Sequence, residues 1–112
     1  METSNKTLYL KSNTIGEGEL GIILIKGFLK AISESKSTPN SIICVNSAVL
    51  LTTSLDDELI TILKTIEAKG VTIYSCGTCL DYYEKRNDLK IGVVGNAIDT
   101  VNMLLNEDIV SL

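Results

Sequence analysis

The stretch Ser41-Ile42-Ile43-Cys44-Val45-Asn46 decides the fold class of this protein. It is a continuous, largely β-branched run, which is typical of a strand buried on both faces, as in a parallel sheet. Val71-Thr72-Ile73-Tyr74-Ser75 and Ile91-Gly92-Val93-Val94 predict two further strands. Residues 6–11 and 108–112 complete a predicted set of five.

The segments between these strands have helical periodicity. The first predicted helix follows a glycine-rich turn, and the apolar positions at helical spacing are Leu20, Leu24, Phe28 and Ile32. Pro39 ends this segment, because a proline disfavours helical geometry in the residue before it.

The second predicted helix begins near Ser54, which is the expected N-cap, and ends at Gly70. Its early acidic residues would be solvated at the positive end of the helix dipole. They are Asp56, Asp57 and Glu58, and the expected apolar face contains Leu59, Ile62 or Leu63, and Ile66.

A short helix is expected to about residue 85, and a last helix over residues 97–106. The expected core face of the last helix contains Ile98, Val101 and Leu105. Five strands separated by four helices, with short connections and right-handed crossovers, predict a single α/β domain over residues 1–112. Its sheet would be parallel, with helices on both faces.

Three cysteines and no histidine occur among the 112 residues. The absence of histidine excludes a Ser-His-Asp triad, a Cys-His dyad within the chain and an HExxH zinc site. Cysteine is therefore the leading candidate for any chemistry. An odd cysteine count and a polar start without a signal-peptide core favour a reducing cytoplasm.

The charge and hydropathy of the chain exclude further classes. Its formal net charge is −4, and no concentrated basic surface is visible for nucleic acid. No apolar run is long enough to span a membrane. The hydrophobic content of 45% is high for a chain this small, so we expect part of it in a homo-oligomer interface.

Cys76-Gly77-Thr78-Cys79 is the strongest chemical motif. It lies at a predicted strand end and opens a helix, and in parallel α/β sheets ligands gather at the carboxyl ends of strands. Backbone N–H groups at such a place stabilise a thiolate. Gly77 would leave room for a reagent, and Thr78 adds a hydroxyl.

Four interpretations of this motif compete. Thioredoxin-like exchange needs a cis-proline beside the motif, and Pro39 lies elsewhere. Zinc needs about four ligands, which the chain could supply only across subunits. The cysteines could also be purely structural. A persulfide carrier needs one activated thiolate and no histidine, and the composition fits that interpretation best.

Other residues would share the same edge of the sheet. Asn46 and Ser47 follow the second strand, and Asn46 is the preferred candidate because it ends a buried strand abruptly. Ser12, Asn13, Gly95 and Asn96 follow two other strands, and loop or cap roles are the simpler interpretation for at least half of the set. Cys44 is expected in the core. Tyr82 and Tyr83 either cover the thiol site or pack in a subunit interface, and the interface is favoured.

A second motif, Gly16-Glu17-Gly18-Glu19-Leu20-Gly21, matches GxGxxG between a strand and a helix. Two glutamates stand where a pyrophosphate would need positive potential, and no acidic residue ends the second strand to hold a ribose. We therefore expect no cofactor and interpret the motif as a tight turn that lets the helix pack closely on the sheet.

The stretch from Val71 through Cys76-Gly77-Thr78-Cys79 to Leu80-Asp81-Tyr82-Tyr83 resembles the signature of the DsrE-like family. The nearest resemblance is to the carboxyl-terminal domain of YedF-type selenium-metabolism proteins. The glycine-rich turn, Asn46-Ser47 after the second strand and the Gly95-Asn96 turn agree with it.

This resemblance implies a three-layer α/β/α fold with a five-stranded, mostly parallel sheet, and a homo- or hetero-oligomer. It also implies a sulfur relay in which Cys76 carries a persulfide between donor and acceptor proteins, with Cys79 as an extra thiol. The chain departs from the family pattern at residues 95–99. It also lacks the TusA-like domain that usually precedes this one, so we expect a stand-alone variant or a fragment.

Overall fold

A five-stranded parallel sheet forms the centre of the computed structural model, which describes residues 2–3 and 5–112. Its strand order is β6-β5-β4-β2-β7, and every neighbouring pair is parallel. The strands are β2 (Lys6–Leu10), β4 (Ser41–Cys44), β5 (Thr72–Cys76), β6 (Val93–Gly95) and β7 (Asp108–Ser111). The predicted α/β class is therefore confirmed.

A second sheet of two short strands was not predicted. It pairs β1 (Glu2–Thr3) with β3 (Ser37–Thr38), and the latter lies directly before Pro39. Two-residue strands of polar residues carry too little periodicity to be recognised in a sequence.

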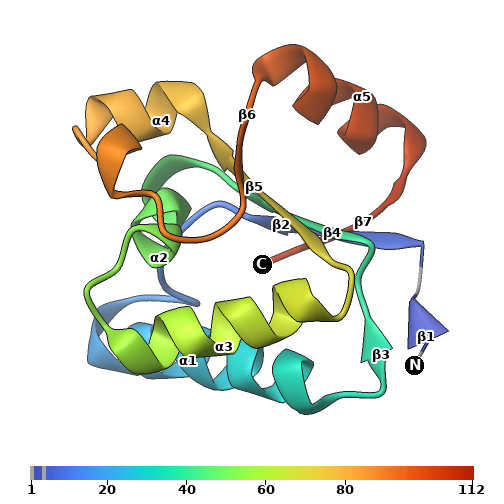
Figure 1. The fold of residues 1–112 in the computed structure, drawn as a ribbon, viewed down its shortest axis with the longest axis horizontal. Helices are drawn as coiled ribbons and strands as arrows, with labels where there is room; N and C mark the ends of the chain where they lie inside the picture. Colours follow the sequence, from blue (N-terminus) through green and yellow to red (C-terminus); the bar gives the residue numbers. More distant parts are fainter. Residues whose placement is uncertain (1, 4) are drawn as a thin grey trace.

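Helices cover both faces of the large sheet, as predicted (Figure 1). α1 (Gly18–Glu34) and α3 (Asp57–Ala68) run side by side under one face, and α5 (Ala97–Asn106) lies over the other. The order of the strands explains this, because the β6-to-β7 connection crosses the sheet in the opposite direction to the others. The short helical segments are η1 (Asn46–Ala48), α2 (Val49–Thr52), α4 (Gly77–Tyr82) and η2 (Arg86–Asp88).

The main core lies between the sheet and the pair α1 and α3. Alternate strand residues point into it, and the register places Leu8 beside Ile42 and Ile42 beside Ile73. From α3 it receives the predicted apolar face, namely Leu59, Ile62, Leu63 and Ile66. No helix in the described part of the chain is long and apolar enough to cross a membrane.

The buried face of α1 differs from the prediction. Leu20 and Phe28 are 64% and 47% exposed, whereas Gly21, Ile25 and Leu29 are buried. Apolar residues occupy so many positions of this helix that several stripes fit its period. Gly21 fixes the rotation of α1 about its own axis, because only a glycine fits here: a Cβ at this position would lie 2.5 Å from the carbonyl oxygen of Gly16. This glycine therefore packs against the preceding turn, and not against the sheet as expected.

The start of α3 also differs from the prediction. The N-cap is Asp56, whose carboxylate accepts hydrogen bonds from the backbone N–H groups of Glu58 and Leu59. Ser54 instead accepts from the N–H of Asp56. The acidic residues are more than solvated charges, since Lys26 of α1 pairs with Asp56 at 2.8 Å and with Glu58 at 2.7 Å. These pairs join the two helices.

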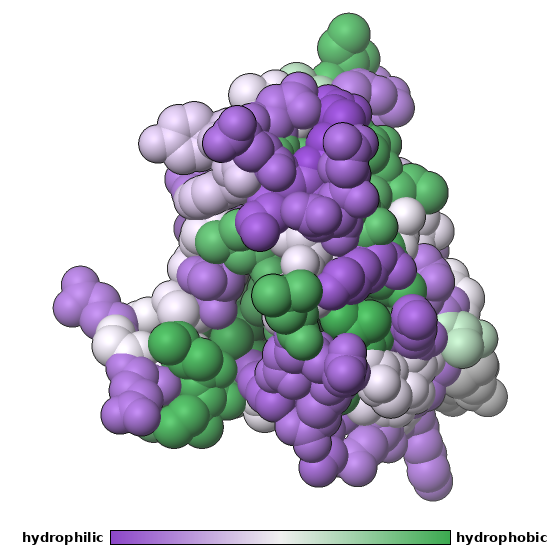
Figure 2. Space-filling view, turned by 60° about the vertical axis from the view of Figure 1, so that its left-hand side comes forward, coloured by the Kyte–Doolittle hydropathy of each residue, from purple (hydrophilic) through white to green (hydrophobic). Residues whose placement is uncertain are grey.

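The predicted core face of α5 is wrong. Ile98 and Leu105 are each 76% exposed and Val101 is 49% exposed, and no described residue of this helix is buried. A periodic apolar stripe predicts that one face of a helix is apolar enough to be buried, but it does not identify the surface that buries it. Figure 2 shows hydrophobic side chains reaching the surface between hydrophilic areas.

Candidate functional site

Cys76 and Cys79 occupy the junction between β5 and α4. Cys76 is the last residue of the strand and the N-cap of the helix, and Cys79 lies in the first turn of the helix. This is the strand-end position that the sequence predicts for the motif. Both thiols are free and only partly buried.

Cys79 accepts a hydrogen bond from the loop that follows β4. Its Sγ accepts from the backbone N–H of Asn46, with a nitrogen–sulfur distance of 3.1 Å. Asn46 makes its contact from a left-handed backbone conformation, with φ at 53°. Asparagine adopts this region more readily than most residues.

The environment of Cys79 keeps its proton on. Burial first, and then the neighbouring Cys76 thiol, raise the pKa of Cys79, and the N–H of Asn46 only partly opposes them. The general expectation of a thiolate in this motif is therefore wrong for Cys79. Cys79 is a thiol that can donate a hydrogen bond to a sulfur anion on Cys76.

Cys44 is a core residue, as predicted. It is 2% exposed on β4, and burial raises the pKa of its thiol to about 12. A thiol in this state is neither reached by reagents nor ionised at neutral pH. The chemistry of the described chain therefore rests on the other two cysteines.

The two sulfurs of the motif border different pockets. Cys76 lines a pocket of about 400 Å³ together with Gly77, Thr78, Asp81, Arg86, Val94, Gly95, Asn96 and Ala97. Cys79 lines a neighbouring pocket of about 380 Å³ together with Asn46, Thr78, Tyr82 and Tyr83. Thr78 is the one residue that lines both.

Arg86 is the site residue that the sequence analysis missed. It is the only arginine of the chain, and it lies in η2, five residues beyond Asp81. Its Nε and Nη2 donate to the two carboxylate oxygens of Asp81 at 2.7 and 3.0 Å, and Nη2 also donates to the carbonyl of Gly77 at 3.3 Å. No spacing pattern marked it, although a lone arginine so close to a cysteine motif was a usable signal.

Gly77 leaves room for this arginine. A Cβ on Gly77 would lie 2.8 Å from Nη2 of Arg86 and 3.2 Å from Cγ1 of Val94. Gly77 was predicted to leave space for a reagent beside Cys76. Part of that space is occupied by the guanidinium of Arg86.

The remaining predicted residues divide into two groups. Gly95 and Asn96 line the Cys76 pocket, and the amide of Asn96 caps α5 by accepting from the N–H of Asp99 at 2.9 Å. Ser47 and Asn13 line neither cysteine pocket. The hydroxyl of Ser47 accepts from the N–H of Asn13 at 3.1 Å, so these two hold neighbouring loops together.

Tyr82 and Tyr83 border the thiol site. Their rings meet edge to face with centroids 5.2 Å apart, and both line the Cys79 pocket. Tyr82 is 81% exposed, so this ring forms the outer rim. The interface favoured for them from the sequence would therefore lie at the mouth of that pocket.

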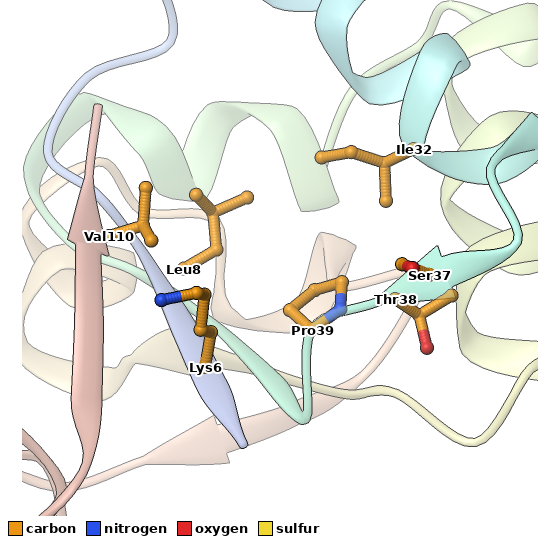
Figure 3. A pocket seen from close by; sticks show the side chains of 7 residues that line it. All are labelled: Lys6, Leu8, Ile32, Ser37, Thr38, Pro39 and Val110. Carbon is orange, nitrogen blue, oxygen red and sulfur yellow. The ribbon is translucent and has the colours of Figure 1, made fainter. Parts of the chain in front are cut away.

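A separate pocket lies at the β7 side of the molecule (Figure 3). It has a volume of about 180 Å³, and Leu8, Val110 and Ile32 converge on it from β2, β7 and α1. Lys6, Ser37, Thr38 and Pro39 complete its lining. It contains no thiol, and Pro39 lies here and not beside the cysteine motif, unlike the proline of a thioredoxin-like site.

Comparisons with known proteins bear on the fold. No family model matches the sequence, and no curated protein matches it. Several solved structures do match. The ychN protein from E. coli is 16% identical, with a TM-score of 0.71 over 96% of this chain and 99% of its own.

The second solved structure is a conserved protein of unknown function, BT1422, from Bacteroides thetaiotaomicron. It is 20% identical, with a TM-score of 0.66 over 96% of this chain and 95% of its own. Both neighbours have the DsrE-like fold. At these identities the likeness concerns the fold alone. The five-stranded parallel sheet with helices on both faces is therefore a DsrE-like fold.

Proposed function

We propose that this protein is a sulfur carrier that holds a persulfide on Cys76. The observation that carries the proposal is the position of Cys76, a partly exposed thiol at a strand end that opens into a pocket of about 400 Å³. Cys79 supports it, because a protonated neighbouring thiol can donate to a sulfur anion on Cys76. The chemistry needs no histidine and no general base.

The carrier reaction has two exchanges. The Cys76 thiolate attacks the outer sulfur of a donor persulfide, and the donor's own thiolate leaves with the electron pair of the broken S–S bond. An acceptor thiolate later attacks the same sulfur and releases the Cys76 thiolate. The transferred sulfur keeps its oxidation state throughout, so no redox cofactor takes part.

The resemblance to YedF-type domains extends the proposal to selenium, which forms the same kind of bond to a cysteine. We propose that the acceptor is a protein and that the transfer takes place in the cytoplasm, where reduced thiols persist. A second copy of the chain is the proposed cover for the apolar stripe of α5, since Ile98, Val101 and Leu105 are exposed in the single chain.

Mass spectrometry of the intact protein tests the carrier function. Incubation with a cysteine desulfurase and cysteine, or with the selenium analogue, should add the mass of one chalcogen atom to the wild type. The Cys76→Ser variant should gain none, whereas Cys44→Ser serves as the matched control and should gain it. A wild type without an adduct, or a Cys76→Ser variant with one, would contradict the proposal.

The alternative is a non-catalytic oligomeric module that binds a small ligand at this edge of the sheet. The exposed face of α5 and the two adjoining pockets favour it. Titration of the native thiols at neutral pH separates the two functions. A carrier should show a fast-reacting Cys76, whereas the module would leave both motif cysteines inert.

A further inference from the structure

The two cysteine pockets differ in chemical character. The Cys76 pocket contains a guanidinium and a carboxylate, from Arg86 and Asp81, and the amide residue Asn96. The Cys79 pocket contains no charged side chain, and two tyrosines form much of its wall. A sulfur atom bound to Cys76 would therefore be accessible to charged small molecules, and one bound to Cys79 to a partner that packs on the tyrosines.

The charged groups of the Cys76 pocket are arranged as an adjacent pair. Arg86 uses Nε and Nη2 for Asp81 and the carbonyl of Gly77, which leaves Nη1 outside these three bonds. Both side chains are about half exposed, so a ligand can reach them. A guanidinium recognises a carboxylate, and an aspartate recognises an ammonium group. Together they match the two charges of a free amino acid.

The Cys79 pocket has the character of a protein contact. Tyr82 is 81% exposed at its rim and packs edge to face on Tyr83. Exposed tyrosines are enriched at protein–protein interfaces, where their large rings bury area at a small cost in entropy. The thiol of an acceptor protein that docks on these rings would meet Cys79 first.

We propose that sulfur enters and leaves this protein through different pockets. A small amino-acid persulfide binds Arg86 and Asp81 and loads Cys76, and Cys79 takes the sulfur over and presents it in the tyrosine pocket. The inference rests on the proposed carrier function and adds the class of the donor, the role of the second thiol and the direction of transfer.

Each step is a balanced exchange. In the first, Cys76 Sγ bonds to the outer sulfur of the donor, the donor's S–S bond breaks, and the amino acid leaves as a thiolate. In the second, Cys79 Sγ attacks that outer sulfur, the bond to Cys76 Sγ breaks, and the leaving Cys76 thiolate takes up the proton that Cys79 gives up. No oxidant or reductant is consumed, and the transferred sulfur keeps its oxidation state.

The test compares two donors. Cysteine persulfide carries both amino-acid charges, whereas inorganic polysulfide carries no carboxylate or ammonium group. In the Arg86→Gln variant, the rate of loading from cysteine persulfide should fall about tenfold, the usual scale for losing one charge-assisted hydrogen bond. The rate from polysulfide, an anion that Arg86 can attract only by its charge, should fall by a clearly smaller factor. Lys85→Gln is the matched control, since it removes a positive charge one residue away from outside the pocket.

Polysulfide loading also reports whether Arg86→Gln is folded, together with the far-ultraviolet circular dichroism spectrum. If neither donor loads the wild type, the carrier function itself fails. If both donors load it, and Arg86→Gln slows neither or slows both equally, the carrier function stands and the amino-acid pocket is refuted.

Peptide mapping after alkylation tests the direction of transfer. With cysteine persulfide, the Cys79→Ser variant should hold its sulfur on Cys76, and the wild type should hold part of it on Cys79. The Cys76→Ser variant should load Cys79 at least about tenfold more slowly, because that thiol lies outside the charged pocket. Equal loading of Cys79 in Cys76→Ser, with the same dependence on Arg86, would overturn the proposed order.

Discussion

Two glycines of α1 should respond to alanine with opposite signs. Gly21 is buried, and a Cβ there would lie 2.5 Å from the carbonyl oxygen and 2.9 Å from the carbonyl carbon of Gly16. Gly27 lies six residues further along the same helix, and a Cβ there would meet nothing within 4 Å. The pair therefore separates the intrinsic preference for alanine in a helix from the space available for it.

The magnitudes follow from these contacts. Alanine in place of glycine inside a helix stabilises the folded state by about 0.5–1 kcal/mol, so Gly27→Ala should be more stable by that amount. Gly21→Ala has the same intrinsic gain, but its methyl group meets backbone atoms that cannot rotate away. Overpacking of this kind costs roughly 1–3 kcal/mol, and its mid-range value of about 2 kcal/mol leaves a net loss of about 1.3 kcal/mol.

Urea unfolding followed by circular dichroism measures both variants. The free energy of unfolding of a domain this size falls by about 1.5 kcal/mol per molar urea. The unfolding midpoint of Gly27→Ala should therefore rise by about 0.5 M, and that of Gly21→Ala should fall by about 1 M. A Gly21→Ala variant as stable as the wild type would refute the reasoning. It would mean that the turn at Gly16 yields freely, and that Gly21 does not select the buried face of α1.

Three further outcomes are expected. Lys26 holds the pKa of Asp56 and of Glu58 below their ordinary values. The stability that these pairs contribute therefore exists above about pH 4 and is lost at lower pH, as the two carboxylates become protonated. Lys26→Met should flatten this fall in stability with falling pH, and Lys64→Met should not. Ile66→Ala should cost about 3 kcal/mol in urea unfolding and Ile98→Ala under about 0.5 kcal/mol in dilute solution, and equal losses would show that α5 is covered. A chromogenic disulfide reagent at pH 8 should leave Cys44 unlabelled until urea unfolds the protein, and labelling at the native state would contradict its burial.

The sequence was sufficient to predict the sheet because strand identity depends on local composition. The predicted run from Ser41 to Asn46 contains β4, whose residues Ser41–Cys44 are all buried in the middle of the sheet, as a continuous β-branched run should be. The order of the strands could not be predicted, since it depends on which pairs meet across long connections. The buried face of α1 was also out of reach, because it is fixed by the contact between Gly21 and the backbone of Gly16.

The site was predictable to the same degree. Cys76, Gly95 and Asn96 lie together because parallel strands end at one edge, and that rule needs only the strand boundaries. Arg86 entered the site through a turn after α4, and no periodic pattern reports where such a turn leads. The N–H of Asn46 was invisible for another reason, since a backbone donor is common to nearly every residue type and its direction depends on how the chain leaves β4.

The pairing of β2 with β7 has a mechanical consequence. These are the first and last strands of the large sheet along the chain, they lie side by side, and they run in the same direction from Lys6 beside Asp108 to Tyr9 beside Ser111. A force that pulls the two ends of the chain apart therefore slides the strands along each other and loads their hydrogen bonds all at once. An antiparallel terminal pair would open like a zipper, one bond at a time. A machine that unfolds this protein by pulling on its C-terminus would have to break the whole ladder in a single event.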